Sequence, residues 1–517
     1  MASINKKVPK PVVYTHGGAP TYEANAEEQL CRAVMSCMLW EASHYESGES
    51  IVDRIRGLIP KVSPQRVAQI AIDARTLMKI RHAPLLLVRE MARLDTHKHL
   101  VSKLLPEIIQ RADELCEFVA LYWMTKKEPL SAQVKKGLAA AFVKFNEYAL
   151  GKNKQDDKKV TLRDILFLVR PRSKDREQKS VWKKLAEKTL QAPKDSWEVL
   201  LSAEGNNERS WNKLLKDGSL NGLSLIRNLR NMTAAGVNKD LVKQALLGMN
   251  GKNVLPFQYI SAAKYGPEYE SEIEQAMLKC LADKPKLPGK SIIIIDVSGS
   301  MYGAKISEKS EVDRAHAACS MAVLARELCE NPVIYATGGN DGIRVHKTQI
   351  VPARRGFALL EAIYNMQGPL GGGGIFLEQV MNYVKEKEKS ADRVIIITDE
   401  QDCSGQESSP ARADAFGKHN YIINVNTYQH GIGYGKWTHI NSWSEAALDY
   451  IRISEEGFKF SNQAFQQQSV SNQVVAPKKA IKKVRIYAKK AKSGQKTNRN
   501  TSKSVSRNRR IRKVAKS

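Results

Sequence analysis

The sequence predicts a multidomain protein in which a long all-α portion precedes a doubly wound α/β domain and a basic tail. Three observations predict this organisation. Apolar residues recur at helical spacing from about residue 25 to residue 285. Beyond residues 285–289, strand-like runs alternate with helical stretches, a pattern typical of α/β domains. Residues 478–517 carry few large apolar side chains, so we expect this tail to be disordered until it meets a polyanion.

The composition changes along the chain predict four segments. We expect an N-terminal arm without regular structure over residues 1–21 and the helical portion over residues 22–286. The α/β domain is predicted over residues 287–456. A linker rich in Gln, Asn and Ser and the basic tail account for residues 457–517.

Capping signals and apolar spacing justify the helical portion. Ser63 followed by Pro64 is a helix-start signal, and Thr161 is expected to cap a further helix. In four of the predicted helices the side chains expected to face a core are Val67, Ile70, Ala71, Ala74, Leu77 and Met78; Leu85, Leu86 and Val88; Leu162, Ile165, Leu166 and Val169; and Ile273, Met277, Cys280 and Leu281. Many short helices without intervening strands favour an α-solenoid of stacked pairs, although no fixed-period repeat is visible.

The α/β domain is predicted from its strand-like runs. The run Ser291-Ile-Ile-Ile-Ile295 is typical of a strand buried on both faces of a parallel sheet. The predicted strands are residues 291–296, 332–337, 393–398 and 421–426, and the predicted helices are residues 311–329 and 376–388.

Oxygen-bearing side chains follow two of these strands. Asp296, Ser298 and Ser300 come directly after the first strand, and Asp399 follows the third. Parallel sheets bind ligands just beyond the carboxyl ends of their strands, so we expect these four residues to converge. They are hard oxygen donors, which magnesium prefers. The sequence therefore predicts a divalent cation, Mg²⁺, held by Asp296, Ser298, Ser300 and Asp399.

Two alternative interpretations of this motif stay open. The segment can be a Ser/Gly turn with an N-capping aspartate and no metal. It can also be compared with an aspartyl-phosphate phosphatase, whose motif has a second carboxylate where this chain has Ser298. Because that carboxylate would be the general acid, its absence disfavours catalysis. We predict that the protein has no catalytic residues and is not an enzyme.

The charge predicts a polyanionic partner. The net charge is +28, and residues 478–517 hold 17 Lys or Arg and no Asp or Glu. Removing these 17 charges leaves +11 on the remainder, so the body is basic in its own right. Nucleic acid is the usual partner of such a surface, and an anionic membrane is the alternative. No signal peptide or membrane span is apparent and the seven cysteines are scattered, which favours a reduced cytoplasmic protein.

Residues 290–452 resemble a von Willebrand factor A domain. Asp296-x-Ser298-x-Ser300 matches the metal-ion-dependent adhesion site of that family, and Asp399 matches its later aspartate. The family also carries a threonine in a Gly-Gly-Thr loop. This chain has Pro369-Leu-Gly-Gly-Gly-Gly-Ile375, with Gly373 at the expected position of the threonine. The resemblance therefore implies a metal site that lacks one direct ligand.

The order of helical portion and A domain resembles the Ro autoantigen family, whose helical part is called the TROVE module. The resemblance covers roughly residues 22–455. The stretches that carry it are Leu30-Cys-Arg-Ala-Val34, Arg75 with Arg81-His82-Ala-Pro84, Lys159-Val-Thr-Leu-Arg-Asp-Ile-Leu166, Leu225-Ile-Arg-Asn-Leu-Arg-Asn-Met-Thr233 and Leu255-Pro-Phe257. It implies a HEAT-like helical-repeat ring that binds Y RNAs outside and single-stranded ends of misfolded RNAs in its hole.

Basic residues of the helical portion are the candidate RNA contacts. A cluster lies where the family carries a His-x-Lys-Pro element for Y RNA, although the histidine is absent here. We predict RNA binding by Arg170, Arg172, Lys174, Arg176, Lys179 and Lys183, by Arg227 and Arg230, and by Arg81 and His82. The alternatives are a solvated helical face for the cluster, pairing with acids for Arg227 and Arg230, and helix capping for Arg81 and His82. Tyr122, Trp123 and Trp211 are interpreted as core side chains.

These expectations combine into one function. We predict a cytoplasmic ribonucleoprotein component, monomeric as a protein, that binds a Y-like small RNA and the single-stranded ends of misfolded or precursor RNA. It would act in RNA quality control or processing, with an exoribonuclease as a partner and no membrane. The alternative is a metal-dependent protein-interaction scaffold without a specific RNA. For the tail we favour a nonspecific RNA tether over a solubility tail or a membrane anchor.

Overall fold

The computed structural model describes most of the chain before residue 456. The described residues are 12–14, 20–22, 25–36, 47–153, 157–191, 197–251, 254–306, 312–404, 415–426, 437–441 and 446–455. The chain divides into one unit of residues 1–458 and a second of residues 459–517. The second unit lies outside the described residues, so the predicted linker and basic tail stay predictions.

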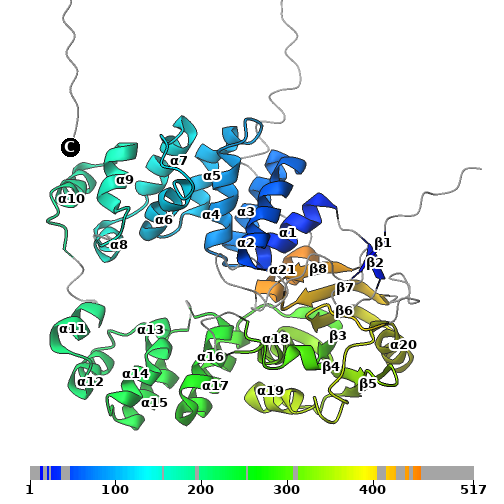
Figure 1. Ribbon diagram of the computed structural model, residues 1–517. Helices are drawn as coiled ribbons and strands as arrows, with labels where there is room; N and C mark the ends of the chain where they lie inside the picture. The colour runs from blue at the N-terminus through cyan, green and yellow to red at the C-terminus, as the bar shows by residue number, and fades with distance from the viewer. Residues whose placement is uncertain are drawn as a thin grey trace, which may run out of the picture. The chain divides into compact units, whose positions relative to one another are not determined.

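The helical portion extends from helix α1 to helix α17 (Figure 1). Its helices are α1 (Ala26–Ser36), α2 (Gly48–Leu58), α3 (Pro64–Thr76), α4 (His82–Met91), α5 (Val101–Ile108), α6 (Ala112–Tyr122), α7 (Ala132–Phe142), α8 (Glu147–Lys152), α9 (Leu162–Val169), α10 (Arg176–Ala186), α11 (Trp197–Glu204), α12 (Glu208–Lys216), α13 (Gly222–Arg227), α14 (Leu229–Ala234), α15 (Lys239–Gly248), α16 (Pro256–Tyr265) and α17 (Glu270–Ala282).

Alternate helices stack on one another in this portion. Helix α3 packs on α5, α5 on α7 and α7 on α9, while α4 packs on α6 and α6 on α9. Such two-layer stacking is the arrangement expected of an α-solenoid.

The two predicted helix caps had different outcomes. Thr161 caps α9, since its side chain accepts a hydrogen bond from the Asp164 amide. Ser63 occupies the cap position of α3, but its side chain makes no capping bond.

The α/β domain follows directly. Its elements are β3 (Leu287–Asp296), α18 (Arg314–Leu328), β4 (Cys329–Asn340), β5 (Val345–Ile350), α19 (Gly356–Tyr364), α20 (Leu377–Glu388), β6 (Ala391–Thr398), β7 (Gly417–Asn424), β8 (Thr438–Asn441) and α21 (Ala446–Glu455). The sheet has the order β5-β4-β3-β6-β7-β8, and only the β4–β5 pairing is antiparallel.

The isoleucine run of β3 is buried on both faces, as predicted. Ile292 and Ile294 belong to an apolar cluster that includes Val380 and Val384 of α20. Ile293 and Ile295 point the other way, into a cluster shared with α18 and α19. Helices therefore cover both faces, and the continuous apolar run follows because neither face meets water.

Some elements were missed by sequence patterns. The predicted strands and helices of the α/β domain are all present, but β5, α19, β8 and α21 were not predicted. The expectation of an arm without regular structure is wrong for the described part of residues 1–21. Strand β1 (Val12–Tyr14) pairs antiparallel with β2 (Pro20–Tyr22), because Pro20 lies at a strand end where its missing amide costs no ladder bond.

No helix in the described part of the chain combines the length and the apolar character that crossing a bilayer requires.

Candidate functional site

The sheet topology brings the predicted metal residues together. Strand β3 lies between β4 and β6, so the chain leaves β3 to one side and later returns to its other side. This reversal is a topological switch point, where ligands bind at the carboxyl ends of parallel strands. Strand β3 ends at Asp296 and β6 ends at Thr398, immediately before Asp399. Asp296, Ser298 and Asp399 are all buried at this edge.

Hydrogen bonds fix the loop that follows β3. Asp296 Oδ1 accepts a hydrogen bond from the Ser298 amide at 2.8 Å, and Asp296 Oδ2 accepts one from the Thr398 hydroxyl at 2.6 Å. The hydroxyl oxygens of Ser298 and Ser300 are 3.2 Å apart. Adjacent ligands of an octahedral magnesium ion, with bonds of about 2.1 Å, are separated by roughly 3 Å. The two serines are therefore spaced as neighbouring ligands of such an ion.

Arg314 brings a positive charge to the same edge. Its Nη1 lies 3.4 Å from Asp399 Oδ2 and 3.4 Å from the backbone oxygen of Ser300, and the side chain is buried. Burial raises the pKa of Asp296 above its ordinary value, and the neighbouring Asp399 raises it further. A cation bound beside Asp296 would relieve this cost, because it would favour the charged carboxylate.

The glycine loop explains why no threonine stands at position 373. A Cβ atom added to Gly373 would lie 2.8 Å from the Gly339 backbone oxygen and 3.0 Å from the Asp341 amide nitrogen. A Cβ added to Gly299 would lie 2.7 Å from the Gly372 oxygen, so the glycine loop lies against the serine loop. Threonine at 373 therefore requires a backbone shift, and the direct ligand that the A-domain resemblance lacks is excluded by packing.

The donor set fits a small cation of the magnesium type. Two serine hydroxyls and the carboxylates of Asp296 and Asp399 supply oxygen only, and no threonine completes the set. The described residues contain no group of three or more His, Cys, Asp or Glu side chains that could hold a metal. A bound ion would supply an open coordination position for a partner's oxygen.

The predicted RNA contacts between α9 and α10 form one exposed group, here called the α9–α10 basic patch. All six side chains are exposed: Arg170, Arg172, Lys174, Arg176, Lys179 and Lys183. Arg170 ends α9 in a left-handed conformation, and Asp175 caps α10 by accepting a hydrogen bond from the Gln178 amide. The connection between the helices is thus fixed by backbone structure rather than by its charged side chains.

The patch has few internal carboxylate partners. Within the described residues, only Lys183 makes an ion pair, with Glu187 at 3.8 Å. Arg176 occupies the first position of α10, where the helix dipole disfavours a cation. Helix stability therefore does not explain Arg176, and its contact with an anion stays a prediction. The cations that follow α9 stabilise that helix through its dipole by only about 0.3–1 kcal/mol each.

Arg227 and Arg230 lie on two short helices rather than on one. Helix α13 ends at Arg227 and α14 begins at Leu229, with Asn228 between them. Both arginine side chains are exposed, and no acid pairs with either in the part of the chain that the structure describes. This arrangement favours phosphate contact over the alternative of pairing with acids.

Arg81 and His82 belong to an ion-pair cluster with α6. Arg81 Nη2 lies 2.6 Å from Asp113 Oδ2 and 2.8 Å from Glu117 Oε1. His82 Nε2 lies 3.5 Å from Glu117 Oε2. The capping alternative is wrong for the Arg81 side chain, which makes no cap bond. The ion pairs give Arg81 a role in the packing of α4 on α6, and RNA contact by Arg81 and His82 stays a prediction.

A buried ion pair joins the first helix to the α/β domain. Arg32 of α1 donates from Nη1 to Glu400 Oε1 at 3.1 Å, and His439 Nδ1 lies 2.8 Å from the same oxygen. Burial acts to raise the pKa of Glu400, but Arg32 and His439 outweigh it and lower this pKa to about 2. Glu400 is thus an anion held between α1 and β8, next to Asp399.

Three functional candidates were missed. Arg314 has a signal in the sequence, because an arginine at the start of a helix opposes the dipole and so points to a partner elsewhere. Trp123 was interpreted as core, yet it lines a surface pocket, whereas Tyr122 and Trp211 are buried as predicted. Phe167 lines the same pocket with 53% of its surface exposed, and it falls outside the predicted core face of its helix.

Comparison with known proteins gives a match to one family model and matches to solved structures. The family model described as TROVE domain matches residues 188–354, a segment that runs from the end of α10 to the loop after β5. No curated protein matches the chain.

A solved structure shares the fold. The crystal structure of the Deinococcus radiodurans Ro (RSR) protein superposes with a TM-score of 0.55 and 15% sequence identity. The match covers 83% of this chain and 99% of that protein. At this identity the likeness is one of fold, including the helix-rich portion and the mixed sheet. The chain is thus similar to the TROVE family over residues 188–354 and shares its fold with the Deinococcus radiodurans protein.

Proposed function

We propose that this protein is a noncatalytic RNA-binding protein that forms a ribonucleoprotein with a Y-like small RNA. In this proposal it also binds the single-stranded ends of misfolded or precursor RNA for quality control or processing in the cytoplasm, beside an exoribonuclease. The observation that carries the proposal is the α9–α10 basic patch. Five of its six cations are exposed without a carboxylate partner among the described residues, and a polyanion is the ligand that neutralises them.

We further propose that the helices form a HEAT-like ring closed through the α/β domain. Contacts at both ends of the helical portion support this. Helix α1 meets β8 and Glu400 through Arg32. Helix α17 meets α19, where Glu274 Oε1 accepts a hydrogen bond from the Phe357 amide at 2.6 Å. In this proposal the helices between these two contacts would enclose a hole, and a narrow hole admits single-stranded RNA but not a duplex.

The test measures RNA affinity for the body and the tail separately. A labelled hairpin RNA with a single-stranded 3′ end is titrated with the full chain and with a chain that ends at residue 458. We expect the shortened chain to retain binding at 50 mM salt, with an affinity that falls as salt rises. Loss of all binding on removal of residues 459–517 would show that only the tail contacts RNA, and the proposal would fail.

A second function, a metal-dependent protein-interaction scaffold, is favoured by the spacing of Ser298 and Ser300. In it, Mg²⁺ on Asp296, Ser298, Ser300 and Asp399 takes a partner's carboxylate, as the A-domain resemblance implies. One pull-down experiment from cell extract distinguishes the two functions. A partner that survives nuclease but is released by a chelator supports the scaffold. A partner that nuclease releases supports the ribonucleoprotein.

A further inference from the structure

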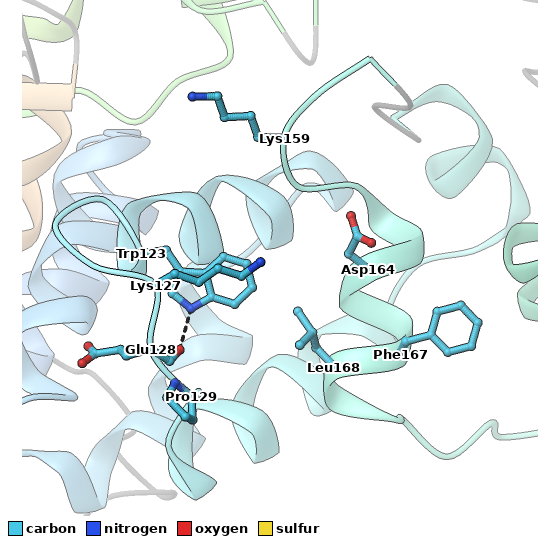
Figure 2. Close-up of a pocket in the computed structure, with 8 residues that line it drawn as sticks. All are labelled: Trp123, Lys127, Glu128, Pro129, Lys159, Asp164, Phe167 and Leu168. Carbon is cyan, nitrogen blue, oxygen red and sulfur yellow. Dashed lines mark hydrogen bonds between the residues drawn. The ribbon is translucent and has the colours of Figure 1, made fainter. Parts of the chain in front are cut away.

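A surface pocket lies between the end of α6 and helix α9 (Figure 2). It has a volume of about 610 Å³, within the range of small-ligand sites. The residues that line this pocket, here called the aromatic pocket, are Trp123, Lys127, Glu128, Pro129, Lys159, Asp164, Phe167 and Leu168. Two aromatic rings and two lysines are among these residues. Aromatic rings stack on flat ligands and lysines attract anions, so this combination favours a ligand that is both flat and anionic.

Phe167 offers an open aromatic face. The Arg163 guanidinium carbon lies 5.0 Å from the centre of the Phe167 ring, and Arg163 Nε also donates to the Ala186 oxygen at 2.8 Å. The ring is therefore supported by a fixed cation, while about half of its surface stays exposed to solvent. Exposing a phenylalanine in this way forgoes the burial that a core position would give. A ligand that stacks on the ring would compensate for this loss of burial.

The indole of Trp123, at the end of α6, also lines the pocket. Its Nε1 donates to the Glu128 backbone oxygen at 2.7 Å, which fixes the ring orientation. Figure 2 shows the Lys127 side chain lying across the indole, and its ammonium nitrogen is 5.1 Å from the centre of that ring. Lys159 extends into the same region from the loop before α9. Trp123 and Lys127 thus present an apolar surface and a charge side by side.

The charges of the aromatic pocket favour an anion. Lys127 and Lys159 are exposed, and no carboxylate pairs with either of them in the described part of the chain. The two acids are already engaged. Asp164 accepts hydrogen bonds from the amide and hydroxyl of Thr161, and Glu128 accepts one from Arg93 at 3.1 Å. The two lysines of the pocket therefore remain without a carboxylate partner among the described residues, whereas its two acids already accept hydrogen bonds from other residues.

We propose that the aromatic pocket binds one nucleotide of single-stranded RNA. The base stacks on the exposed Phe167 ring, and the flanking phosphates contact Lys127 and Lys159. This inference rests on the proposed RNA-binding function. The aromatic pocket adjoins the α9–α10 basic patch, because Phe167 lies in the last turn of α9 and Arg170 follows that helix. A strand held by the patch can therefore continue into the pocket, and every base has a face that an aromatic ring can stack on.

The test compares RNA with and without bases. The full chain is titrated with a labelled oligouridylate and with the same oligomer in which the bases are replaced by abasic sites. Because the backbone phosphates are the same, contacts of the tail and the patch contribute equally to both. We expect the wild-type chain to prefer the base-bearing strand about fivefold or more, since stacking on one aromatic side chain is worth about 1–3 kcal/mol.

Phe167→Ala is expected to remove most of this preference without changing the salt dependence of binding. Tyr148→Ala is the matched control, because Tyr148 is also 53% exposed and lies on the neighbouring α8. The double variant Lys127→Gln with Lys159→Gln is expected to lower the salt slope by about 1.4, from roughly 0.7 per phosphate on a single strand. Its control is Lys385→Gln with Lys387→Gln on α20, which should leave the slope unchanged.

Two other outcomes would overturn the inference. If Phe167→Ala retains the wild-type preference for bases, or if wild-type protein shows no preference, the nucleotide subsite is absent while RNA binding stands. If the wild-type chain binds neither oligomer nor a hairpin RNA, the proposed function fails and the subsite with it. Photo-crosslinking of 4-thiouridine RNA gives an independent reading, with the adduct expected on the peptides that contain Trp123 or Phe167.

Discussion

The arginines of this chain fall into two groups that look alike in the sequence and differ in the structure. Arg32, Arg75 and Arg81 lie against carboxylates far away in the chain. Arg170, Arg172 and Arg176 are exposed and have no carboxylate partner in the described part of the protein. The first group holds elements together and has its charge cancelled. The second leaves its charge open to a ligand, so exposure and pairing, rather than residue type, separate structural cations from binding cations.

The largest expected effect comes from Arg32. Arg32→Met leaves the buried Glu400 carboxylate without its main partner, and loss of one member of a buried ion pair costs about 3–5 kcal/mol. We expect the free energy of unfolding, measured by urea denaturation, to fall by this amount. Arg66→Met is the control, because Arg66 and Glu27 are each 44% exposed and such pairs contribute at most about 1 kcal/mol. Equal losses in the two variants would contradict the structural role of Arg32.

The α9–α10 basic patch should show the opposite behaviour. The triple variant Arg172→Gln, Lys174→Gln and Lys179→Gln removes exposed charges that form no ion pairs among the described residues. We expect the affinity for a structured RNA at 0.1 M salt to fall at least tenfold and the salt slope to fall by roughly 2 to 3. The free energy of unfolding should change by about 0.5 kcal/mol or less.

A matched charge change tests whether position matters for RNA. The triple variant Lys385→Gln, Lys387→Gln and Lys389→Gln, at the end of α20, removes the same charge from exposed positions of the α/β domain. If it weakens RNA binding as much as the patch variant, only the overall charge acts and the patch is not a site.

Arg81 gives a smaller effect that tests the boundary between the groups. Arg81→Met breaks contacts with Asp113, Glu114 and Glu117 on α6 at a position where the arginine is 31% exposed. We expect the free energy of unfolding to fall by about 1–2 kcal/mol, reduced from a buried pair by solvent screening. RNA affinity per folded molecule should stay within twofold of wild type. A tenfold loss of affinity would place Arg81 in the RNA interface.

The sequence allowed the strands to be predicted because they carry their own signal. A run such as Ile292–Ile295 has no polar residue, and only a strand covered on both faces accommodates it. The convergence of Asp296 and Asp399 was predictable for the same reason, since both follow such runs. Ion pairing was not predictable. Arg32 and Glu400 are 368 residues apart, and nothing near Arg32 in sequence indicates a carboxylate partner.

The solvent exposure of individual side chains was also not predictable from the sequence. Phe167 lies off the face of α9 on which Leu162 and Ile165 are buried, but whether a neighbouring helix covers such a ring is decided by packing and not by spacing. Gly373 illustrates the reverse case. The sequence shows that position 373 is a glycine, but it does not show why. The reason is the close approach of Gly339, which becomes clear only when strand β4 is placed beside the glycine loop.

The smallest expected effect concerns the metal, where a paired cation and a bound cation compete to neutralise the same carboxylates. Because Arg314 already lies beside Asp399, an added Mg²⁺ has less charge to compensate than in a site without an arginine. We expect Mg²⁺ at about ten times its dissociation constant to raise the free energy of unfolding by about 1.4 kcal/mol. Ser300→Ala should abolish this increment, whereas Ser202→Ala, on the exposed surface of α11, should keep it. An equal Mg²⁺ response in Ser300→Ala and wild type would place the ion elsewhere and leave Arg314 as the cation that serves these carboxylates.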